Sequence, residues 1–512
     1  MNPTMGATAV GAVSLATLGI GAFGLRISRT TSDFYVASRT VGPVANASAI
    51  SGEYLSAASF LGVAGLVLLR GADSLWYPVG YTAGYLFLLV YVAAPLRRSG
   101  AYTLPDFAQL RVESIPARRV SSALVVLIGM LYLVPQFQGA GLTVRAITGA
   151  PSWTGEVAVA AVVLLIVASG GMRSITLVQA FQYWLKLVAL LVPLAVMVVI
   201  WRSHGAPMTP ALHAADWADP MGHEHAAYLT YSLITATFLG TMGLPHVVVR
   251  FYTNRDGRAA RRTTVAVLGF LSCFYLLPTL YGVLGRIYAF DLVRTGRTDS
   301  VVLELPGDVL GGGLGADLLT AVLGAGAFAA FLSTSSGLVV SIGGVLSQDL
   351  VSRRLEGVPA FRLAGVFGVS VTLCLTFASS GLAVAHAVEL AFAVAASTFC
   401  PLLLLGIWWR GLTARGAIAG MLSGGALSTG AVLLVMFGVT AHGWPGAVLQ
   451  QPALVTVPIA FAAMIGVSLA TRDRLPAHLA STMVRLHTPE DIDLDRGSYH
   501  PESDRSSYRT NR

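Results

Sequence analysis

Long apolar runs separated by short polar segments make up almost the whole chain. A helix of about 20 residues spans the roughly 30 Å hydrocarbon core of a bilayer. Runs of about this length occur at residues 5–25, 43–69, 75–96, 120–147, 155–168, 175–201, 229–249, 263–289, 313–347, 362–379, 384–408, 416–437 and 453–471. The pattern predicts an all-α polytopic membrane protein with thirteen transmembrane helices.

The arginines are distributed unevenly among the segments between these runs. If the N-terminus lies outside and the runs alternate in direction, 26 of the 32 arginines fall in inner segments or in the tail. Arg250 is counted among them, at the start of a basic segment after the seventh run. Because positive residues concentrate in cytoplasmic loops, we expect the N-terminus outside and the C-terminus in the cytoplasm. The corresponding location is the inner membrane of a bacterial-type cell.

Composition narrows the class of protein further. Only 11% of the 512 residues are charged, against about a quarter in soluble domains. We therefore expect one membrane domain over residues 1–471, followed by a polar, arginine-rich and disordered cytoplasmic tail over 472–512. The net charge of +8 comes from arginines scattered over short loops, which does not indicate a nucleic-acid partner. The three cysteines lie in apolar runs without metal-ligand spacing.

The second run departs from what a lipid-facing helix requires. It carries Ser51, Gly52, Glu53 and Ser56 near its middle. A carboxylate at membrane depth costs at least about 2.5 kcal/mol, so Glu53 is expected to face protein or water. If the helix unwinds at Ser51 and Gly52, the freed carbonyls can bind a cation. The alternative is a face of small residues against which a neighbouring helix packs.

The seventh run contains a second weak point. Gly240, Thr241, Gly243 and Pro245 lie two-thirds along it. A proline in a helix interior removes a hydrogen bond and clashes with the preceding turn, so the helix should unwind here or at least kink. We predict that this interruption faces the second run.

The spacing of the two weak points suggests an internal repeat. They lie five runs apart, which fits two inverted five-helix repeats over about 43–201 and 229–408. Binding sites in such proteins form where two broken helices meet near the membrane midplane.

Polar residues also interrupt the sixth and ninth runs. Gln179, Gln182 and Lys186, the single lysine of the chain, share one helix face that should point into the bundle. Ser333 and Thr334 begin a series of four consecutive hydroxyls. Hydroxyl oxygens suit a hard cation such as Na⁺, but they can equally bond back to the carbonyl four residues earlier. In the eleventh run His386 and Glu389 share a face near one end.

Four motifs occur in the order found in one transporter family: GEYLSAASFLG at 52–62, SGGMRSITLVQ at 169–179, GLPHVVVRFYT at 243–253 and AAFLSTSSGLVVS at 329–341. In these motifs the chain resembles the sodium:solute symporter family from about residue 30 to 470. Within that family it is similar to the cation/acetate (monocarboxylate) symporters.

The resemblance implies a LeuT-type fold of five plus five helices with flanking helices. It also implies a Na⁺ site made by the carbonyls of Gly52, Leu55 and Ala330 and the hydroxyls of Ser333 and Thr334. Many relatives have aspartate where this chain has Gln179, so Glu53 becomes the candidate for the missing charge.

The expected function is cation-coupled uptake of a short-chain monocarboxylate such as acetate, propionate or pyruvate. Na⁺ is the expected coupling ion, H⁺ is the alternative, and no organic cofactor, nucleic acid or obligate protein partner is expected. The N-terminal ends of the broken runs, with Thr241, would supply donors for the anion. The rival functions are symport of another solute, such as proline, a sugar or pantothenate, and solute sensing. We expect no enzyme activity.

Overall fold

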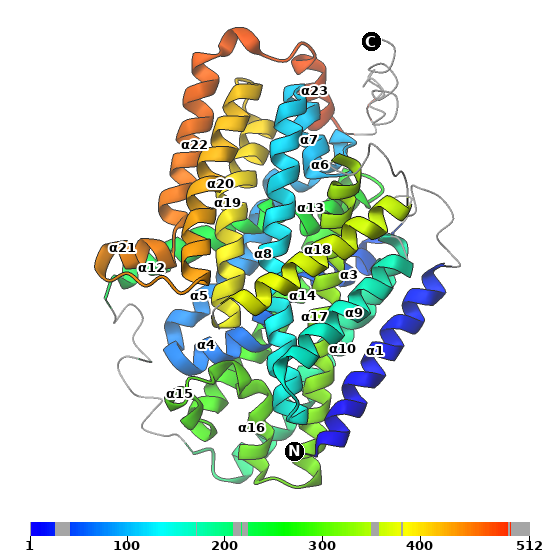
Figure 1. Ribbon diagram of the computed structural model, residues 1–512, viewed down its shortest axis with the longest axis vertical. Coiled ribbons are helices and arrows are strands. Elements are labelled where there is room, and N and C mark those ends of the chain that lie inside the picture. The colour runs from blue at the N-terminus through cyan, green and yellow to red at the C-terminus, as the bar shows by residue number, and fades with distance from the viewer. Residues whose placement is uncertain are drawn as a thin grey trace.

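The computed structural model describes residues 2–25, 41–169, 172–207, 217, 224–349, 358–379, 382–489 and 492. Within these ranges the protein is all-helical and has no strand (Figure 1). Several helices begin at residues whose side chains cap the free backbone amides. Asp256, for example, caps the helix that starts at Gly257 by accepting from the Ala259 amide at 2.7 Å.

The first half of the chain forms a flanking helix and the first repeat. These elements are α1 (Pro3–Leu25), α3 (Pro43–Tyr54), the π-helical η2 (Ala58–Gly62), α4 (Val63–Arg70), η3 (Gly71–Leu75), α5 (Trp76–Tyr91), α6 (Ala93–Ser99), α7 (Leu104–Val112), α8 (Ile115–Thr148), α9 (Ser152–Ser169) and α10 (Met172–Ser203).

The second half forms the second repeat and further flanking helices. They are α12 (Ala226–Gly243), α13 (Pro245–Tyr252), α14 (Gly257–Tyr288), α15 (Asp291–Arg294), η5 (Thr298–Ser300), α16 (Val301–Leu310), α17 (Leu314–Asp349), α18 (Val358–Ala378), α19 (Val384–Trp408), α20 (Ala414–Met436), α21 (Gly443–Gln450), α22 (Ala453–Ala470), η6 (Arg472–Arg474) and α23 (Leu479–His487).

The packing of the helices follows a five-plus-five arrangement. In the first repeat α10 packs on α3, and in the second repeat the equivalent α19 packs on α12. The second helix of each repeat packs against the first helix of the other, α5 against α12 and α14 against α3 and α4. The two third helices, α8 and α17, pack together. Equivalent helices of the two repeats thus make equivalent contacts, which is expected of two repeats related by internal symmetry. The positions of the two weak points in the sequence predicted such a repeat.

Both predicted weak points are interruptions of a helix. α3 ends at Tyr54, and helix resumes only at Ala58. α12 ends at Gly243, Leu244 is extended, and Pro245 begins α13. Proline fits the first position of a helix because its missing amide would lack a helical partner there.

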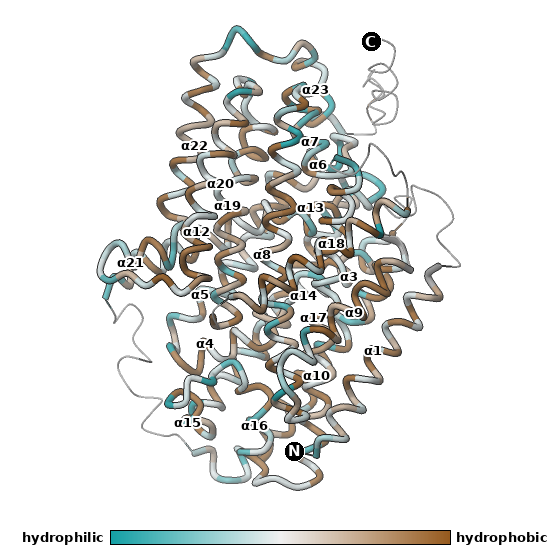
Figure 2. Tube along the Cα trace, viewed as in Figure 1, coloured by the Kyte–Doolittle hydropathy of each residue, from teal (hydrophilic) through white to brown (hydrophobic). Residues whose placement is uncertain are grey.

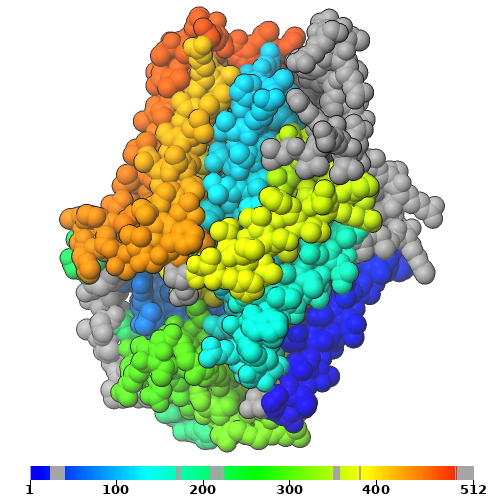
Figure 3. Space-filling model, in the orientation of Figure 1, coloured from blue at the N-terminus to red at the C-terminus, as the bar shows by residue number. Residues whose placement is uncertain are grey.

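The outer surface is that of a membrane protein. Hydrophobic colours dominate along α1, α9 and α22 in Figure 2, and hydrophilic colours gather near α6, α15 and the turn after α22. In Figure 3, α18, α9 and α1 cross one face obliquely side by side. α10 exposes about half of the side chains of Val188, Leu191 and Val192, which is expected of a face toward lipid.

Eleven helical stretches in the described chain are long and apolar enough to cross a membrane. Ala58–Tyr91 is one continuous stretch where two runs were predicted, and Ser152–Ala168 is shorter than the others. The number thirteen therefore stays a prediction. α1 begins at one end of the molecule and α23 lies at the other (Figure 1), which agrees with an odd number of crossings.

One prediction about the tail was wrong. The segment after 471 was expected to lack structure, yet Leu479–His487 forms α23, which packs on α6. Its Met483 and Leu486 are buried, and this apolar stripe, too short to resemble a membrane run, gives the helix a reason to form.

Candidate functional site

The interruption between α3 and η2 is buried and its backbone groups find side-chain partners. The amide of Ala57 donates to Gln136 Oε1 of α8 at 3.0 Å. The Glu53 carbonyl accepts from Thr334 Oγ1 at 2.6 Å. The carbonyls of Gly52 and Leu55 accept from side chains of α10 and α17. A broken helix is tolerated at membrane depth only when its backbone is satisfied in this way.

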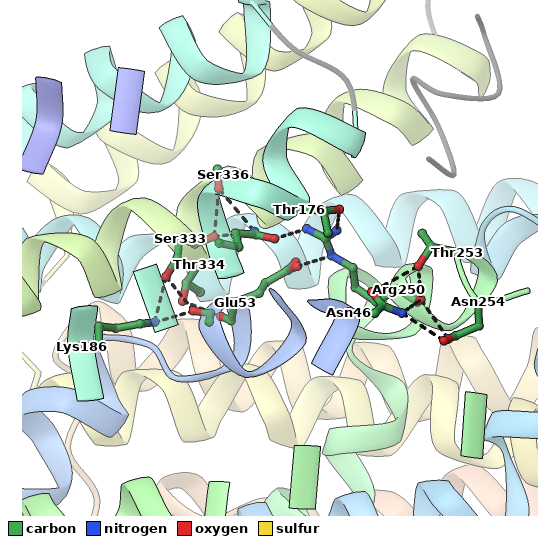
Figure 4. A network of polar contacts seen from close by, with 12 residues as sticks. Asn46, Glu53, Thr176, Lys186, Arg250, Thr253, Asn254, Ser333, Thr334 and Ser336 are labelled. Atoms are coloured by element: carbon green, nitrogen blue, oxygen red, sulfur yellow. Dashed lines mark hydrogen bonds and ion pairs between the residues drawn. The ribbon is translucent and has the colours of Figure 1, made fainter. Parts of the chain in front are cut away.

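Lys186 of α10 lies at the centre of these oxygens. Its Nζ contacts the Gly52 carbonyl, and it lies 2.8 Å from the Leu55 carbonyl and 3.0 Å from Ser333 Oγ. The side chain is fully buried and points into the break (Figure 4). The structure thus brings together three of the oxygens predicted to bind Na⁺, and places a side-chain nitrogen among them.

The remaining two predicted ligands make other contacts. The Ala330 carbonyl accepts from Ser333 Oγ at 3.0 Å. Thr334 donates across to α3, and not to the carbonyl four residues earlier in its own helix, which was the alternative. The hydroxyls of α17 therefore tie that helix to the break in α3. Their role as sodium ligands stays a prediction.

Glu53 faces protein, as expected, and its partner is Arg250 of α13. Arg250 Nε lies 2.7 Å from Glu53 Oε2, its NH1 donates to Thr176 Oγ1 at 2.7 Å, and its NH2 contacts Gln179 Oε1. Gln179 in turn donates to the Ser333 carbonyl at 2.8 Å. One polar network therefore joins both broken helices to α10 and α17 (Figure 4).

Arg250 was placed wrongly by the sequence. It was counted with a basic cytoplasmic loop, but it is 1% exposed inside α13. The signal that could have identified it is Glu53 itself, because a carboxylate at membrane depth needs a cationic partner. Arg250 follows Pro245 by five residues on the other broken run.

The second interruption contributes a hydroxyl and two close helix contacts. Thr241 Oγ1 lies 2.9 Å from the hydroxyl of Tyr54, which joins the two broken helices directly. Gly240 and Gly243 lie against the backbone of α19, where an added Cβ would meet the Phe392 carbonyl at 2.5 Å and the Ala395 carbonyl at 2.4 Å. These glycines thus fit α12 against α19, whereas only Thr241 presents a polar group to the break.

Aromatic side chains surround the region where the two breaks meet. The rings of Tyr54 and Tyr85 lie 4.8 Å apart, and those of Tyr81 and Phe392 lie 4.9 Å apart. Ser56 lies in the non-helical segment and is 1% exposed. Sequence patterns do not reveal this aromatic cluster, because its members come from separate helices and none interrupts an apolar pattern.

Gln182 is one predicted residue that does not join the site. It is buried, but its Nε2 donates to Thr17 Oγ1 of the flanking helix α1 at 3.2 Å. The three polar residues of α10 therefore all point into protein, as predicted, but only Gln179 and Lys186 reach the break. Glu389 accepts from the hydroxyl of Tyr77 at 2.6 Å and is buried, and is thus not a residue reaching toward the membrane surface.

A cleft of about 450 Å³ opens at one side of this site. It is bounded by the C-terminal ends of α4 and α20, the N-terminal ends of α12 and α19, and α21. Arg70, Asp73 and His386 line it, and Tyr77 lies in its wall. Tyr77 contacts Tyr81, which contacts Tyr54, so aromatic rings separate the cleft from the two breaks.

The opposite side is closed by a buried polar cluster next to Arg250. Asn46 Nδ2 donates to Asn254 Oδ1 at 3.2 Å, and Thr263 Oγ1 donates to the same oxygen at 2.8 Å. Thr253 Oγ1 donates to the Arg250 carbonyl at 2.7 Å. These residues come from α3, α14 and the turn that follows α13, and all are fully buried. The site therefore has a cleft beyond aromatic rings on one side and a hydrogen-bonded polar cluster on the other.

Comparison with known proteins gives a consistent result for sequence and fold. A family model described as the sodium:solute symporter family matches residues 34–424. The chain is 31% identical to the uncharacterized symporter YwcA of Bacillus subtilis (strain 168), over 92% of this chain and 96% of that protein. It is 30% identical to a monocarboxylic acid transporter of Corynebacterium glutamicum, over 90% of this chain and 91% of the relative.

Solved structures share the fold at low sequence identity. A Na⁺-coupled sialic acid symporter in a substrate-bound outward-open state superimposes with a TM-score of 0.72 at 14% identity, over 96% of this chain and 99% of that one. Mhp1, a nucleobase-cation-symport-1 family transporter, gives 0.56 at 13% identity, over 89% and 99% of the two chains. The architecture is thus the LeuT-type fold of transporters.

Proposed function

The chain belongs to the sodium:solute symporter family, and from this premise we propose that it carries a short-chain monocarboxylate into the cell together with a cation. Acetate, propionate and pyruvate are the substrates proposed. The relative from Corynebacterium glutamicum, described as a monocarboxylic acid transporter, supports this substrate class. Membership of the family suggests Na⁺ as the coupling ion, and H⁺ is the alternative.

The observation that carries the proposal is the meeting of two interrupted helices in a buried polar site beside a cleft. The α3–η2 and α12–α13 interruptions are joined by the contact between Tyr54 and Thr241. Backbone that leaves the helical pattern at membrane depth is typical of the solute and ion sites of secondary transporters. The site is therefore suited to bind a small solute taken from the cleft.

The charges around the interruptions favour an anion with a single negative charge. Arg250 and Lys186 are the cationic side chains of the network, and Glu53 is its carboxylate. One monocarboxylate would balance the second cationic group, and burial makes an unbalanced charge costly. The N-terminal end of α13 and the hydroxyls of Tyr54 and Thr241 offer further donors for a carboxylate.

The surrounding aromatic cluster favours a small substrate. Tyr54, Tyr81, Tyr85 and Phe392 are each at most 2% exposed and lie around the junction of the breaks. A short alkyl chain can replace ring–ring contacts with little reorganisation, whereas a bulky solute would have to displace several rings. This supports two- and three-carbon acids as substrates.

Solute counterflow in proteoliposomes tests the substrate class. Vesicles loaded with unlabelled propionate should take up labelled propionate faster than vesicles without it, and loaded acetate or pyruvate should act in the same way. Vesicles loaded with proline, a sugar or pantothenate should not. Exchange supported by one of those solutes, and by no monocarboxylate, would overturn the substrate proposal while leaving the transporter family intact.

A further inference from the structure

The contacts of Lys186 account for all the hydrogen-bonding capacity of an ammonium group. The carbonyl oxygens of Gly52 and Leu55 can only accept. Ser333 Oγ has one proton, which its position 2.7 Å from the Gly52 carbonyl and 3.0 Å from the Ala330 carbonyl directs toward those oxygens. Lys186 therefore donates to Ser333 as well. An ammonium group has three N–H donors, and here each of the three donates to one of these oxygens.

The backbone of α3 approaches α10 closely enough for this contact to form. At Gly52 an added Cβ would lie 2.2 Å from the Gln179 carbonyl, so only glycine permits the approach. Lys186 follows Gln179 by seven residues, two helical turns, and therefore emerges on the same face of α10. The fit between Gly52 and α10 thus directs the lysine side chain toward the unwound end of α3.

A metal ion at this position would need the oxygens that the ammonium group already holds. The Glu53 carboxylate is paired with Arg250 and so does not offset a further positive charge at this position. A second cation would therefore share three oxygens with Lys186 inside a fully buried site. Like charges placed together in such surroundings repel strongly. The residues present do not fit Na⁺ here.

We propose that Lys186 is a tethered cation: its ammonium group takes the position between α3 and α17 at which Na⁺ was expected, and this position binds no metal ion during transport. A tethered cation cannot leave the protein, so the contact of α10 with α3 and α17 does not depend on the sodium concentration. This inference rests on the proposed transport function for its uptake measurements. A separate binding measurement tests it without any substrate.

The first test compares uptake in sodium and in choline media of equal ionic strength and equal membrane potential. If H⁺ is the coupling ion, the wild-type protein should take up labelled propionate at the same initial rate in both media. If Na⁺ couples from another site, the sodium concentration for half-maximal uptake should be the same in the wild-type and Ser333→Ala proteins. A half-maximal sodium concentration that rises in Ser333→Ala would overturn the proposal.

Removal of the tethered cation should create a sodium requirement. In the Lys186→Ala protein, uptake in choline should fall at least about tenfold, because buried carbonyls lose their donor. Sodium or methylammonium added to the medium should restore uptake saturably by occupying the freed oxygens. Val188→Ala, on the lipid-facing side of the same helix, is the matched control and should behave as wild type. Wild-type uptake by Lys186→Ala in choline would contradict the proposal.

A milder variant covers the case in which Lys186→Ala does not fold. Ser333→Ala removes one of the three oxygens and leaves both carbonyls in place. Its uptake should be slower than wild type, with the same dependence on sodium. A sodium ligand at this position predicts the opposite, a sodium requirement whose half-maximal concentration rises in Ser333→Ala.

Binding of ²²Na⁺ to the purified protein separates this inference from the proposed function. If no monocarboxylate is transported in any medium, the function fails, but the binding assay still gives a result. Absence of saturable ²²Na⁺ binding, or binding that Ser333→Ala leaves unchanged, supports the tethered cation. Saturable binding to the wild-type protein that Ser333→Ala abolishes would overturn it.

Discussion

At the residue scale, the Glu53–Arg250 pair joins two segments that lie 197 residues apart in the sequence. The two side chains are 2% and 1% exposed, and their nearest charged atoms are 2.7 Å apart. Removing two charges from water is costly, and the attraction between them offsets this cost only when their other hydrogen bonds are made. Thr176 and Gln179 make those bonds for Arg250. The pair is therefore stable only as a unit.

Breaking this pair on one side should destabilise the protein strongly. In Glu53→Gln an unpaired guanidinium remains buried, which costs about 3–5 kcal/mol of unfolding free energy. The midpoint of thermal unfolding in detergent should fall accordingly. The control is Asp291→Asn, which removes the partner of Arg294 in a pair 3.6 Å apart on the exposed surface and should change little. If Glu53→Gln lowered the unfolding midpoint as little as Asp291→Asn, the buried pair would not be tightly coupled.

The sequence identified the residues of this network better than their partners. A carboxylate within an apolar run predicts its own burial, and a lysine seven residues from a glutamine predicts a shared face. The partner of Glu53 was missed because Arg250 stands next to a basic loop and the arginine count assigned it there. Local patterns cannot decide whether a residue at a span end turns inward or outward, because tertiary contacts decide it.

At the element scale, α12 fits against α19 through glycines at the end where α12 unwinds. An added Cβ at Gly240 or Gly243 would come within 2.5 Å of a carbonyl oxygen of α19. The interruption at Leu244 therefore has two causes. Pro245 cannot continue the helix, and the close contact with α19 fixes where it ends.

Adding a methyl group at this contact should separate the helices. Gly243→Ala should lower unfolding free energy by about 1–3 kcal/mol, which is typical of overpacking. Gly269→Ala on α14, where an added Cβ meets nothing within 4 Å, should be neutral or stabilising by up to about 1 kcal/mol. Thermal unfolding of both variants in the same detergent gives the comparison. A Gly243→Ala protein as stable as Gly269→Ala would show that the close packing is absent.

The connection between α14 and α17 also contacts the start of α19. Asp299 of η5 accepts a hydrogen bond from the Val384 amide at 2.9 Å, outside the membrane-spanning helices. Burial raises the pKa of the Asp299 carboxyl from 3.8 to about 6. The folded protein thus binds this proton more tightly than the unfolded chain does.

The sign of the resulting pH dependence follows from that shift. The contribution of Asp299 to stability is fully present below a pH of about 3.8 and is lost as the pH rises through about 6. The unfolding midpoint of the wild-type protein should fall across this interval relative to that of Asp299→Asn, which cannot titrate there. Parallel curves for the two proteins across the interval would show that the pKa is not raised.

The long elements could be predicted from sequence, and the short ones could not. All thirteen predicted runs coincide with helices, because about 20 apolar residues leave few other options at membrane depth. Helices such as α7, α16 and α23 are too short to give such a signal, and they form because the larger helices provide a surface for them.

At the scale of the whole molecule, the two sides of the site differ. A cleft lined by Arg70 and His386 reaches toward it from one side, and the cluster of Asn46, Asn254 and Thr263 closes the other. This asymmetry fits one conformation of a transporter that exposes its site to each side of the membrane in turn. With the predicted orientation, the cleft faces outside.

Reporter fusions test that orientation. A reporter that works only in the cytoplasm should be active when fused after Arg512, and one that works only outside should be active when inserted at Gly312, between α16 and α17. The arginine distribution supports both outcomes. Activity of the outside-requiring reporter at Arg512 would reverse the orientation and direct the cleft toward the cytoplasm.

The central claim is coupled, concentrative transport, and accumulation in proteoliposomes tests it most directly. An inward cation gradient, of Na⁺ or of H⁺, is imposed on vesicles that hold the purified protein, and internal labelled pyruvate is followed over time. One cation that enters with one monocarboxylate moves no net charge, so the concentration gradient of the cation supplies the free energy. Pyruvate should rise above its external concentration and fall back when an ionophore collapses the gradient. Equilibration without accumulation under both gradients would contradict the claim.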